Sequence, residues 1–194
     1  MSAHLSIRKP SPDAIHAFLR SQSTLNFSYP SVGATATTPP PGYAIDRARI
    51  KLGQGQQTFE AAKSALETWT HFRLGWVEAT PLEPSIQVGN VVAVAAKAAG
   101  VWWLNACRIV YLVHEEAPII KSGFAYGTLP AHAETGEERF LIEWDPRSNA
   151  VHYDILAFSK PHGPLSHLGY PWVRHLQKRF RDDSASAMLR AVTR

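Results

Sequence analysis

YPWVRHLQKRFRDDSASAMLRAVTR, residues 170–194, has the strongest periodicity in the chain. Its apolar residues recur every three or four positions, which is the spacing of one face of an α-helix. A helix of roughly twenty residues is about 30 Å long, enough to cross a whole small sheet. We therefore predict a terminal helix that buries one apolar face against a sheet, and this face consists of Val173, Leu176, Phe180, Ala187, Met188 and Ala191.

The chain upstream of this helix has the pattern of antiparallel strands. About six β-type segments fall between residues 71 and 159, at 72–80, 86–96, 101–113, 123–128, 137–144 and 151–159. The links between them are short and contain turn residues, as in DPRSN at 145–149. Short links imply antiparallel hairpins, because parallel strands need long crossovers.

The N-terminal third contains two predicted helices, an arm and one predicted strand. Ser11 can cap a helix that begins at Pro12 and runs to about Gln22. Residues 29–42 are expected to form an extended arm, since the triple proline at 39–41 fits neither a helix nor a central strand. Further along, residues 43–52 alternate like a strand, 53–55 form a Gly-Gln-Gly turn, and 56–70 are amphipathic at helical spacing.

This order of elements predicts an α+β fold, in which a curved antiparallel β-sheet of about six or seven strands is wrapped around the long C-terminal helix. We expect a single domain spanning residues 1–194, with the helix and Pro-rich arm of residues 1–42 packed on a core of residues 43–194. The order resembles the helix-grip fold of START-like and polyketide-cyclase-like proteins. That resemblance implies a cavity between sheet and helix, and it leaves the function open.

The composition excludes several classes of protein. Hydrophobic residues make up 45% of the 194 residues and charged residues 19%, so the chain is not mostly disordered. The single cysteine, Cys107, excludes an internal disulfide framework and a Cys-based zinc site, and we expect it to be inert core. No run of about 18 apolar residues predicts a membrane span, and the N-terminus lacks the apolar segment of a secretory signal. We therefore expect a cytoplasmic protein.

Basic residues are concentrated in the predicted C-terminal helix, although the formal net charge is only +4. After Asp154 the acidic residues are Asp182 and Asp183, whereas the same segment carries Arg174, Lys178, Arg179, Arg181, Arg190 and Arg194. Such a patch could attract an anion or a nucleic acid. A solvated helix face is the more ordinary explanation, so we do not expect a nucleic-acid partner.

Two charged residues fall among apolar neighbours in the predicted sheet. Glu138 alternates with Phe140, and Arg108 alternates with Ala106, so each shares a face with apolar side chains. A charge buried among apolar residues is costly unless it is paired. We predict that Arg108 and Glu138 lie on adjacent inner faces and form the polar floor of a cavity.

Four motifs, in order along the chain, carry a resemblance to a known family. They are DRARIKLGQG at 46–55, NACRIVY at 105–111, FAYGTLPAHAETGEERF at 124–140 and YDILAFSKP at 153–161. Over residues 27–192 the sequence resembles an uncharacterised family of bacteria and plants that is known only as a domain of unknown function. The resemblance implies no activity and no catalytic residue. It implies a characteristic polar set of Asp46, Arg49, Asn105, Arg108, Tyr126, His132, Glu134, Glu137 and Glu138.

We interpret most of these polar residues as the wall of a ligand cavity. The leading hypothesis is a binding protein for a small apolar or amphipathic molecule. The alternative is an enzyme of the hydrolase, cyclase or isomerase type, with Glu138 or Glu137 as general base and His132 as proton shuttle. A structural network of carboxylates, amides and arginines would explain the same residues. The predicted ligand-binding set is Asp46, Arg49, Asn105, Arg108, Tyr126, His132, Glu137 and Glu138.

No motif indicates a cofactor or a metal. His132, Glu134, Glu137 and Glu138 lie close together in sequence, but their spacing matches no established metal signature. The Gly-Gln-Gly turn lacks the other residues of a phosphate-binding loop, and no G-x-S-x-G elbow is present. We attribute the tryptophans at 76, 102 and 103 to core packing rather than to base stacking. We expect no cofactor, and the oligomeric state stays open.

Overall fold

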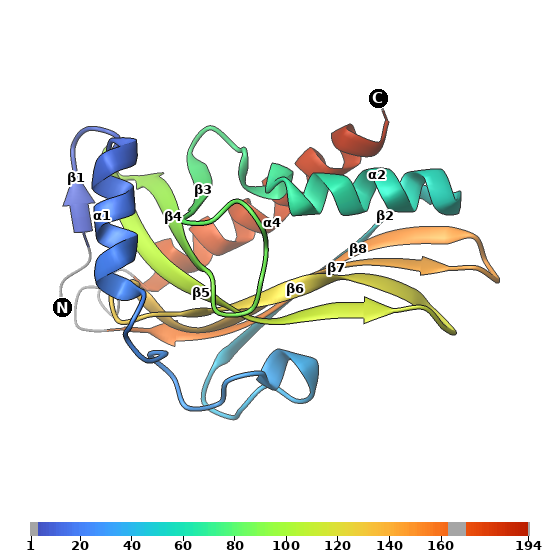
Figure 1. The fold of residues 1–194 in the computed structure, drawn as a ribbon, viewed down its shortest axis with the longest axis horizontal. Helices are drawn as coiled ribbons and strands as arrows, with labels where there is room; N and C mark the ends of the chain where they lie inside the picture. Colours follow the sequence, from blue (N-terminus) through green and yellow to red (C-terminus); the bar gives the residue numbers. More distant parts are fainter. Residues whose placement is uncertain (1–3, 163–169, 194) are drawn as a thin grey trace.

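The computed structural model describes residues 4–162 and 170–193, and its strands form one antiparallel sheet (Figure 1). The order across the sheet is β2–β8–β7–β6–β5–β4–β3, with β1 paired to β5. The strands are β1 (His4–Ser6), β2 (Ala44–Gln54), β3 (Val77–Pro81), β4 (Val91–Ala98), β5 (Val101–Glu115), β6 (Ile120–Thr128), β7 (Glu134–Asp145) and β8 (Ala150–Pro161). The helices are α1 (Pro12–Gln22), α2 (Gly55–Glu67) and α4 (Tyr170–Val192), with short 3-10 turns η1 (Ala34–Ala36) and η2 (Thr70–Phe72).

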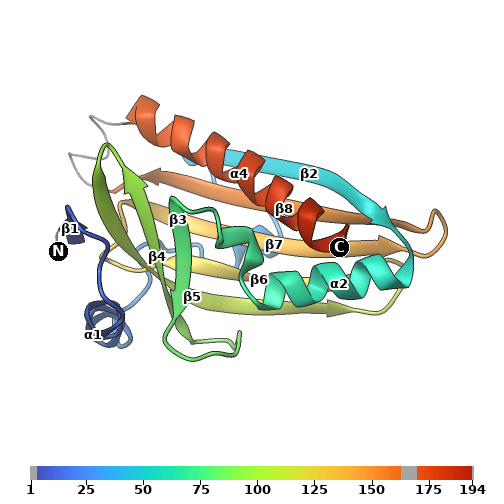
Figure 2. The ribbon, with the colours of Figure 1, turned by 90° about the horizontal axis from the view of Figure 1, so that it is seen from above.

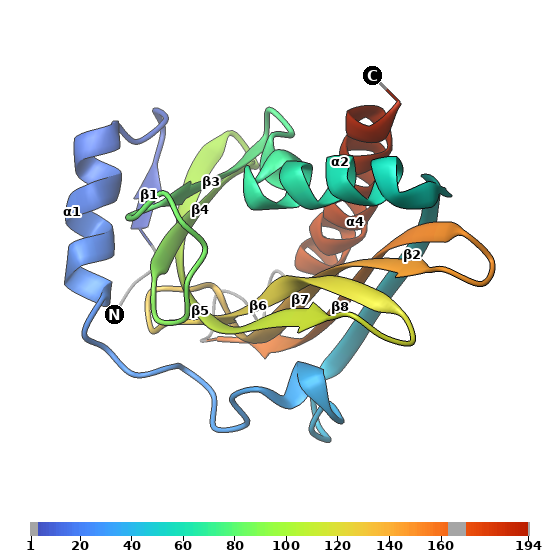
Figure 3. The same cartoon turned by 45° about the vertical axis from the view of Figure 1, so that its right-hand side comes forward.

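The sheet curves, and α2 and α4 lie on its concave side (Figures 2 and 3). Met188 of α4 is fully buried there. The Tyr153 hydroxyl on β8 shares a hydrogen bond of 3.0 Å with the Ser184 hydroxyl on α4. The predicted curved antiparallel sheet wrapped around a C-terminal helix is therefore confirmed, and the chain has a helix-grip, START-like fold.

The helix α1 covers the other face of the sheet at the β4–β5 hairpin. Ile15 of α1 is buried with Ala93 and Leu104 in an apolar cluster separate from the one under α2 and α4. The helix begins where the sequence predicts, because the Ser11 hydroxyl accepts a hydrogen bond from the Ala14 N–H at 3.3 Å. Both faces of β4 and β5 are thus covered, so both faces of these strands carry apolar residues.

Some sequence-based boundaries were wrong. Residues 72–76 are not part of a strand, because η2 ends at Phe72 and β3 begins only at Val77. The fourth strand begins at Val91 instead of Ile86, and β1 was not predicted because three residues are too few for a periodic pattern. Within residues 4–162 and 170–193, no helix has the length and apolar character needed to cross a membrane.

His71 is an unusual member of the core between the sheet and α2. Its side chain is fully buried, stacks on Trp69 with the ring centroids 5.7 Å apart, and lies 4.7 Å from the Phe140 ring. Among the residues that the structure describes, neither ring nitrogen of His71 has a hydrogen-bond partner. Burial therefore lowers the pKa of His71 to about 3, and the ring is neutral in the folded protein at pH 7.

Met188 and Leu189 offer a matched test of how α4 packs, because the first is fully buried and the second is 42% exposed. We expect Met188→Ala to lower the free energy of unfolding by about 2–5 kcal/mol, since truncating a core side chain leaves a cavity. Leu189→Ala should change it by less than about 0.5 kcal/mol. Urea denaturation of the two variants measures both values, and equal losses would contradict this packing of α4.

Replacing His71 by Phe should make stability less dependent on pH. The folded-state pKa of about 3 lies below the ordinary 6.5, so from pH 6.5 down to 3 the unfolded chain binds a proton that the folded chain does not. In that window His71 lowers the free energy of unfolding by about 1.4 kcal/mol per pH unit, and above it His71 adds no slope. His71→Phe removes this loss without breaking a described hydrogen bond. Denaturant melts of the wild type and of His71→Phe at pH 7 and pH 5 measure how much unfolding free energy each protein loses between these pH values. The two losses would be equal if another group were responsible.

Candidate functional site

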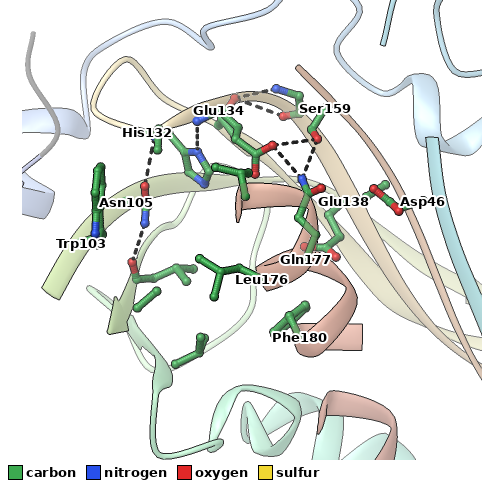
Figure 4. A pocket seen from close by; sticks show the side chains of 18 of the residues that line it. Asp46, Trp103, Asn105, His132, Glu134, Glu138, Ser159, Leu176, Gln177 and Phe180 are labelled. Atoms are coloured by element: carbon green, nitrogen blue, oxygen red, sulfur yellow. Dashed lines mark hydrogen bonds between the residues drawn. The ribbon is translucent and has the colours of Figure 1, made fainter. Parts of the chain in front are cut away.

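A cavity of about 360 Å³ lies between the concave face of the sheet and the first turns of α4 (Figure 4). Apolar side chains form most of its wall, including Phe72, Trp76, Val77, Val94, Ala96, Trp103, Trp172, Val173, Leu176 and Phe180. Polar side chains line the rest, including Asp46, Asn105, Tyr126, His132, Glu134, Glu138, Ser159, Gln177 and Arg181. The cavity thus combines an apolar wall with a cluster of ionisable and hydrogen-bonding groups.

Glu134 joins β7 to β8 and α4 at the polar end of the cavity. Its Oε1 accepts hydrogen bonds from the Ser159 hydroxyl at 3.1 Å and from the Gln177 side-chain N–H at 2.7 Å. Burial raises the pKa of Glu134, whereas these two hydrogen bonds oppose the shift. Gly136, between Glu134 and Glu138 on β7, has a φ of +155°. A Cβ atom at this position would lie 1.9 Å from the Phe158 carbonyl oxygen, so only glycine fits here.

Glu138 lies opposite Tyr126 in the β6–β7 register, and both side chains border the cavity. The Tyr126 hydroxyl donates a hydrogen bond to Glu138 Oε2 at 2.7 Å. Burial raises the pKa of Glu138 to about 7, the hydrogen bond from Tyr126 opposes the shift, and the negative charges of Glu134 and Asp46 add to it. At neutral pH this carboxyl group can therefore either accept or release a proton.

Asp46 connects the edge strand β2 to α4. It is 7% exposed and accepts hydrogen bonds from two arginines of α4, from Arg181 Nη1 at 2.5 Å and from Arg174 Nη2 at 2.9 Å. Such charge-assisted hydrogen bonds are about twice as strong as those between neutral groups. The two arginines that the sequence assigned to an exposed basic face therefore turn inward and hold α4 beside the cavity.

His132 and Asn105 shape the loop that leads into β7. The Nδ1 of His132 accepts a hydrogen bond from the Glu134 backbone N–H at 2.9 Å, which leaves the proton of the neutral ring on Nε2. Burial lowers the pKa of His132 to about 4. Asn105 Oδ1 accepts a hydrogen bond from the Ala133 N–H at 3.1 Å, and its Nδ2 donates to the Val94 carbonyl at 3.3 Å. At pH 7 the His132 ring is therefore neutral, accepts a hydrogen bond at Nδ1 and carries its proton on Nε2.

Glu137 borders the cavity, but its carboxylate points to the convex side of the sheet. There it accepts hydrogen bonds from the Tyr29 hydroxyl at 2.6 Å, the Gly33 N–H at 2.6 Å and the Thr35 N–H at 2.9 Å. All three donors belong to the N-terminal arm, which crosses beneath the sheet (Figure 3). Glu137 was predicted as a ligand-binding residue and as an alternative general base, but its carboxylate does not lie beside that of Glu138, because neighbouring strand residues point to opposite faces. Glu137 holds the arm in place.

The proposed pairing of Arg108 with Glu138 was also wrong. Arg108 lies on the face of β5 that α1 covers, where its guanidinium donates to the Ser23 carbonyl at 2.7 Å and lies 5.4 Å from the Phe27 ring centroid. Arg49 is likewise outside the cavity and forms an ion pair with Glu143. The error for Arg108 arose because both faces of β5 are apolar, so alternation could not tell which face is concave.

The remaining predicted residues come together at the cavity, namely Asp46, Asn105, Tyr126, His132 and Glu138. Because Glu137 points away, the carboxylate and imidazole groups of 132–138 do not converge on one point. Within the described parts of the chain, no three His, Cys, Asp or Glu side chains are arranged to hold a metal ion.

Several polar residues of the site, Glu134 among them, were outside the predicted ligand-binding set. Arg174, Gln177 and Arg181 recur at i, i+3 and i+7, so they form a polar stripe beside the apolar stripe of α4. That spacing could have identified them. Ser159 is a further addition, and a lone serine at the end of a strand carries no comparable signal.

Comparisons with known proteins identify relatives of unknown function. A family model described as a domain of unknown function (DUF1990) matches residues 28–187. A UPF0548 protein of Dictyostelium discoideum is 39% identical, over 95% of this chain and 94% of its own. UPF0548 proteins of Arabidopsis thaliana and Deinococcus radiodurans are 37% and 33% identical, over 78% and 96% of this chain and 74% and 98% of theirs. The predicted resemblance to an uncharacterised family of bacteria and plants is confirmed.

Solved structures share the fold at low sequence identity. The hypothetical protein jhp0584 from Helicobacter pylori matches with a TM-score of 0.51 and 9% identity, over 84% of this chain and 94% of that chain. Human STARD10 matches with a TM-score of 0.47 and 12% identity, over 96% of this chain and 81% of that chain. At such identities a likeness concerns the fold alone.

The positions of Arg108 and Glu138 predict that their contributions to stability are independent. The two side chains lie on opposite faces of the sheet and have separate partners. We expect the losses in Arg108→Met and Glu138→Gln to add in the double variant to within about 0.5 kcal/mol. Denaturant melts of the three variants and the wild type complete the cycle. A recovery of stability in the double variant would mean that the two groups interact.

Proposed function

The chain belongs to the DUF1990 family, and we propose that it binds a small apolar or amphipathic molecule in the cavity between its sheet and α4. The observation that carries this proposal is the cavity itself, about 360 Å³ in volume, with a mostly apolar wall and a few polar groups. Sites for small molecules have this composition and a volume of roughly 300–1,000 Å³. A space that served packing alone would be filled, since protein cores are close-packed.

The rim of the cavity also supports binding. Trp172 borders the cavity from α4 and is 52% exposed, although large aromatic side chains are usually well buried. Ala98 and Ala99 of the β4–β5 turn also line the cavity and offer only small side chains. An apolar molecule entering here would cover exposed aromatic surface and reach the polar groups inside.

A second candidate function is acid–base catalysis in the same cavity. It is favoured by Glu138, whose pKa of about 7 is close to the value that a general acid or base needs at neutral pH. Tyr126 fixes the orientation of this carboxyl group through its hydrogen bond. In this candidate Glu138 would exchange the proton with the bound molecule, whereas the neutral His132 ring would donate a hydrogen bond from Nε2.

Nucleic-acid binding by α4 has no comparable support. Arg174 and Arg181 bind Asp46. Lys178 pairs with Asp182 at 2.8 Å, and Arg179 pairs with Asp183 at 3.4 Å. These contacts offset much of the positive charge that the sequence placed on this helix, and Arg194 lies outside the described residues.

Binding of N-phenyl-1-naphthylamine, an uncharged apolar molecule whose fluorescence rises in apolar surroundings, tests the proposal. We expect saturable binding to the wild type and an affinity at least about tenfold lower in Ala96→Phe, because a larger side chain at a residue that lines the cavity occupies the space of the probe. Fluorescence titration measures both affinities.

Lys97→Phe is the matched control for this experiment. Lys97 is the next residue on β4 and is exposed, so the same new side chain lies outside the cavity. Its affinity for the probe should equal that of the wild type. If the wild type does not bind the probe, or if both variants lose affinity equally, the cavity is not the binding site.

A further inference from the structure

We propose that the bound molecule carries a protonated amine, which binds the Glu138 carboxylate while the apolar part of the molecule lies among the aromatic side chains of the cavity. This inference rests on the proposed function and adds to it the chemical class of the ligand. Three features of the cavity favour an amine: the distribution of charge, the hydrogen-bonding capacity of Glu138 and the aromatic lining.

Charges at the polar end are paired unequally. The described side chains there include three carboxylates, Asp46, Glu134 and Glu138, and two guanidinium groups, Arg174 and Arg181. Both guanidinium groups bind the same carboxylate, Asp46. Glu134 accepts hydrogen bonds from the neutral groups of Ser159 and Gln177. When all three carboxylates are ionised, the negative charges outnumber the two guanidinium charges by one, and a positively charged ligand group would offset that difference.

Glu138 has acceptor capacity that the protein does not use. A carboxylate has roughly four lone-pair sites, and among the described residues Glu138 accepts one hydrogen bond, from Tyr126. Glu138 borders the cavity. Neither of its carboxylate oxygens is both fully buried and without a hydrogen-bond partner. Its raised pKa has burial as the main cause, so a cation beside it would favour the charged form. An ammonium group supplies both the charge and the hydrogen bonds.

Aromatic rings form part of the wall of this cavity. Phe72, Trp103, Tyr126 and Phe180 all line the cavity. A cation over an aromatic face gains about 0.5–2 kcal/mol, more when water is excluded. The protein already uses this interaction beside the cavity, where the Arg179 guanidinium lies 4.4 Å from the centre of the Trp76 ring.

An anionic ligand is the opposing possibility, because Arg181 uses only one of its nitrogens in the described bond to Asp46. Such a ligand would have to sit beside the carboxylates of Glu134 and Glu138, and like charges in a partly desolvated site repel. The amine avoids this repulsion, so the observations favour it.

Displacement of N-phenyl-1-naphthylamine by three molecules with one shared body tests the head group. Tryptamine, tryptophol and indole-3-propionate carry an ammonium, a hydroxyl and a carboxylate on the same indole-ethyl frame. At pH 7.5 we expect tryptamine to displace the probe at a concentration at least about tenfold lower than either of the others. A difference of about tenfold in affinity is what one hydrogen bond to a charged group contributes. Glu138→Gln should abolish this preference.

Glu143→Gln is the matched control, because Glu143 lies on the same strand with its side chain on the opposite face. This variant should keep the preference for tryptamine. Equal or better displacement by tryptophol or indole-3-propionate overturns the inference, and so does a preference that persists in Glu138→Gln. Failure of all three to displace a bound probe also overturns it, while the proposed function stands. If the probe itself does not bind, both fall. The order of the three molecules on the wild type decides the question even if Glu138→Gln does not fold.

Discussion

A nearly straight helix lying in a curved sheet can contact that sheet closely along only part of its length. In α4 the close contact is at the C-terminal half, where Ser184, Ala187 and Met188 are buried. The N-terminal half, from Trp172 to Arg181, borders the cavity and reaches the strands through polar side chains instead. The cavity is therefore a geometric consequence of how the helix and the sheet meet. The ion pairs between α4 and Asp46 hold the helix in this position.

Three acidic residues show how differently one protein can stabilise buried carboxylates. Glu137 receives hydrogen bonds from the N-terminal arm on the convex side, and Asp46 receives two guanidinium groups on the concave side. Glu138 has a single hydroxyl donor and borders the cavity. The first two are fully partnered and serve the architecture. The third keeps unused capacity, which is the property expected of a group that interacts with a bound molecule.

Periodicity was enough to predict the antiparallel strands and the terminal helix, because burial of α4 and of the sheet leaves period-3.6 and period-2 patterns. It could not predict which face of β5 is concave. That strand is covered on both sides, by α1 and by the core under α2, so Leu104 and Cys107 are both buried although they point to opposite faces. The site was predicted where alternation was unambiguous, as for Tyr126 opposite Glu138. Partners from distant segments, such as Asp46 with Arg181, leave no local pattern.

The anchor of the N-terminal arm has a consequence for synthesis of the protein. Tyr29 binds a carboxylate that lies 108 positions later in the chain, and its hydroxyl occupies the place where a side chain at position 127 would be. At roughly 5–20 residues per second, the ribosome needs about 5–20 s to make the intervening chain. The arm emerges first, yet it can dock only after β6 and β7 have paired. Residues 29–35 are thus among the last to reach their native contacts, and until then they are open to chaperones and proteases.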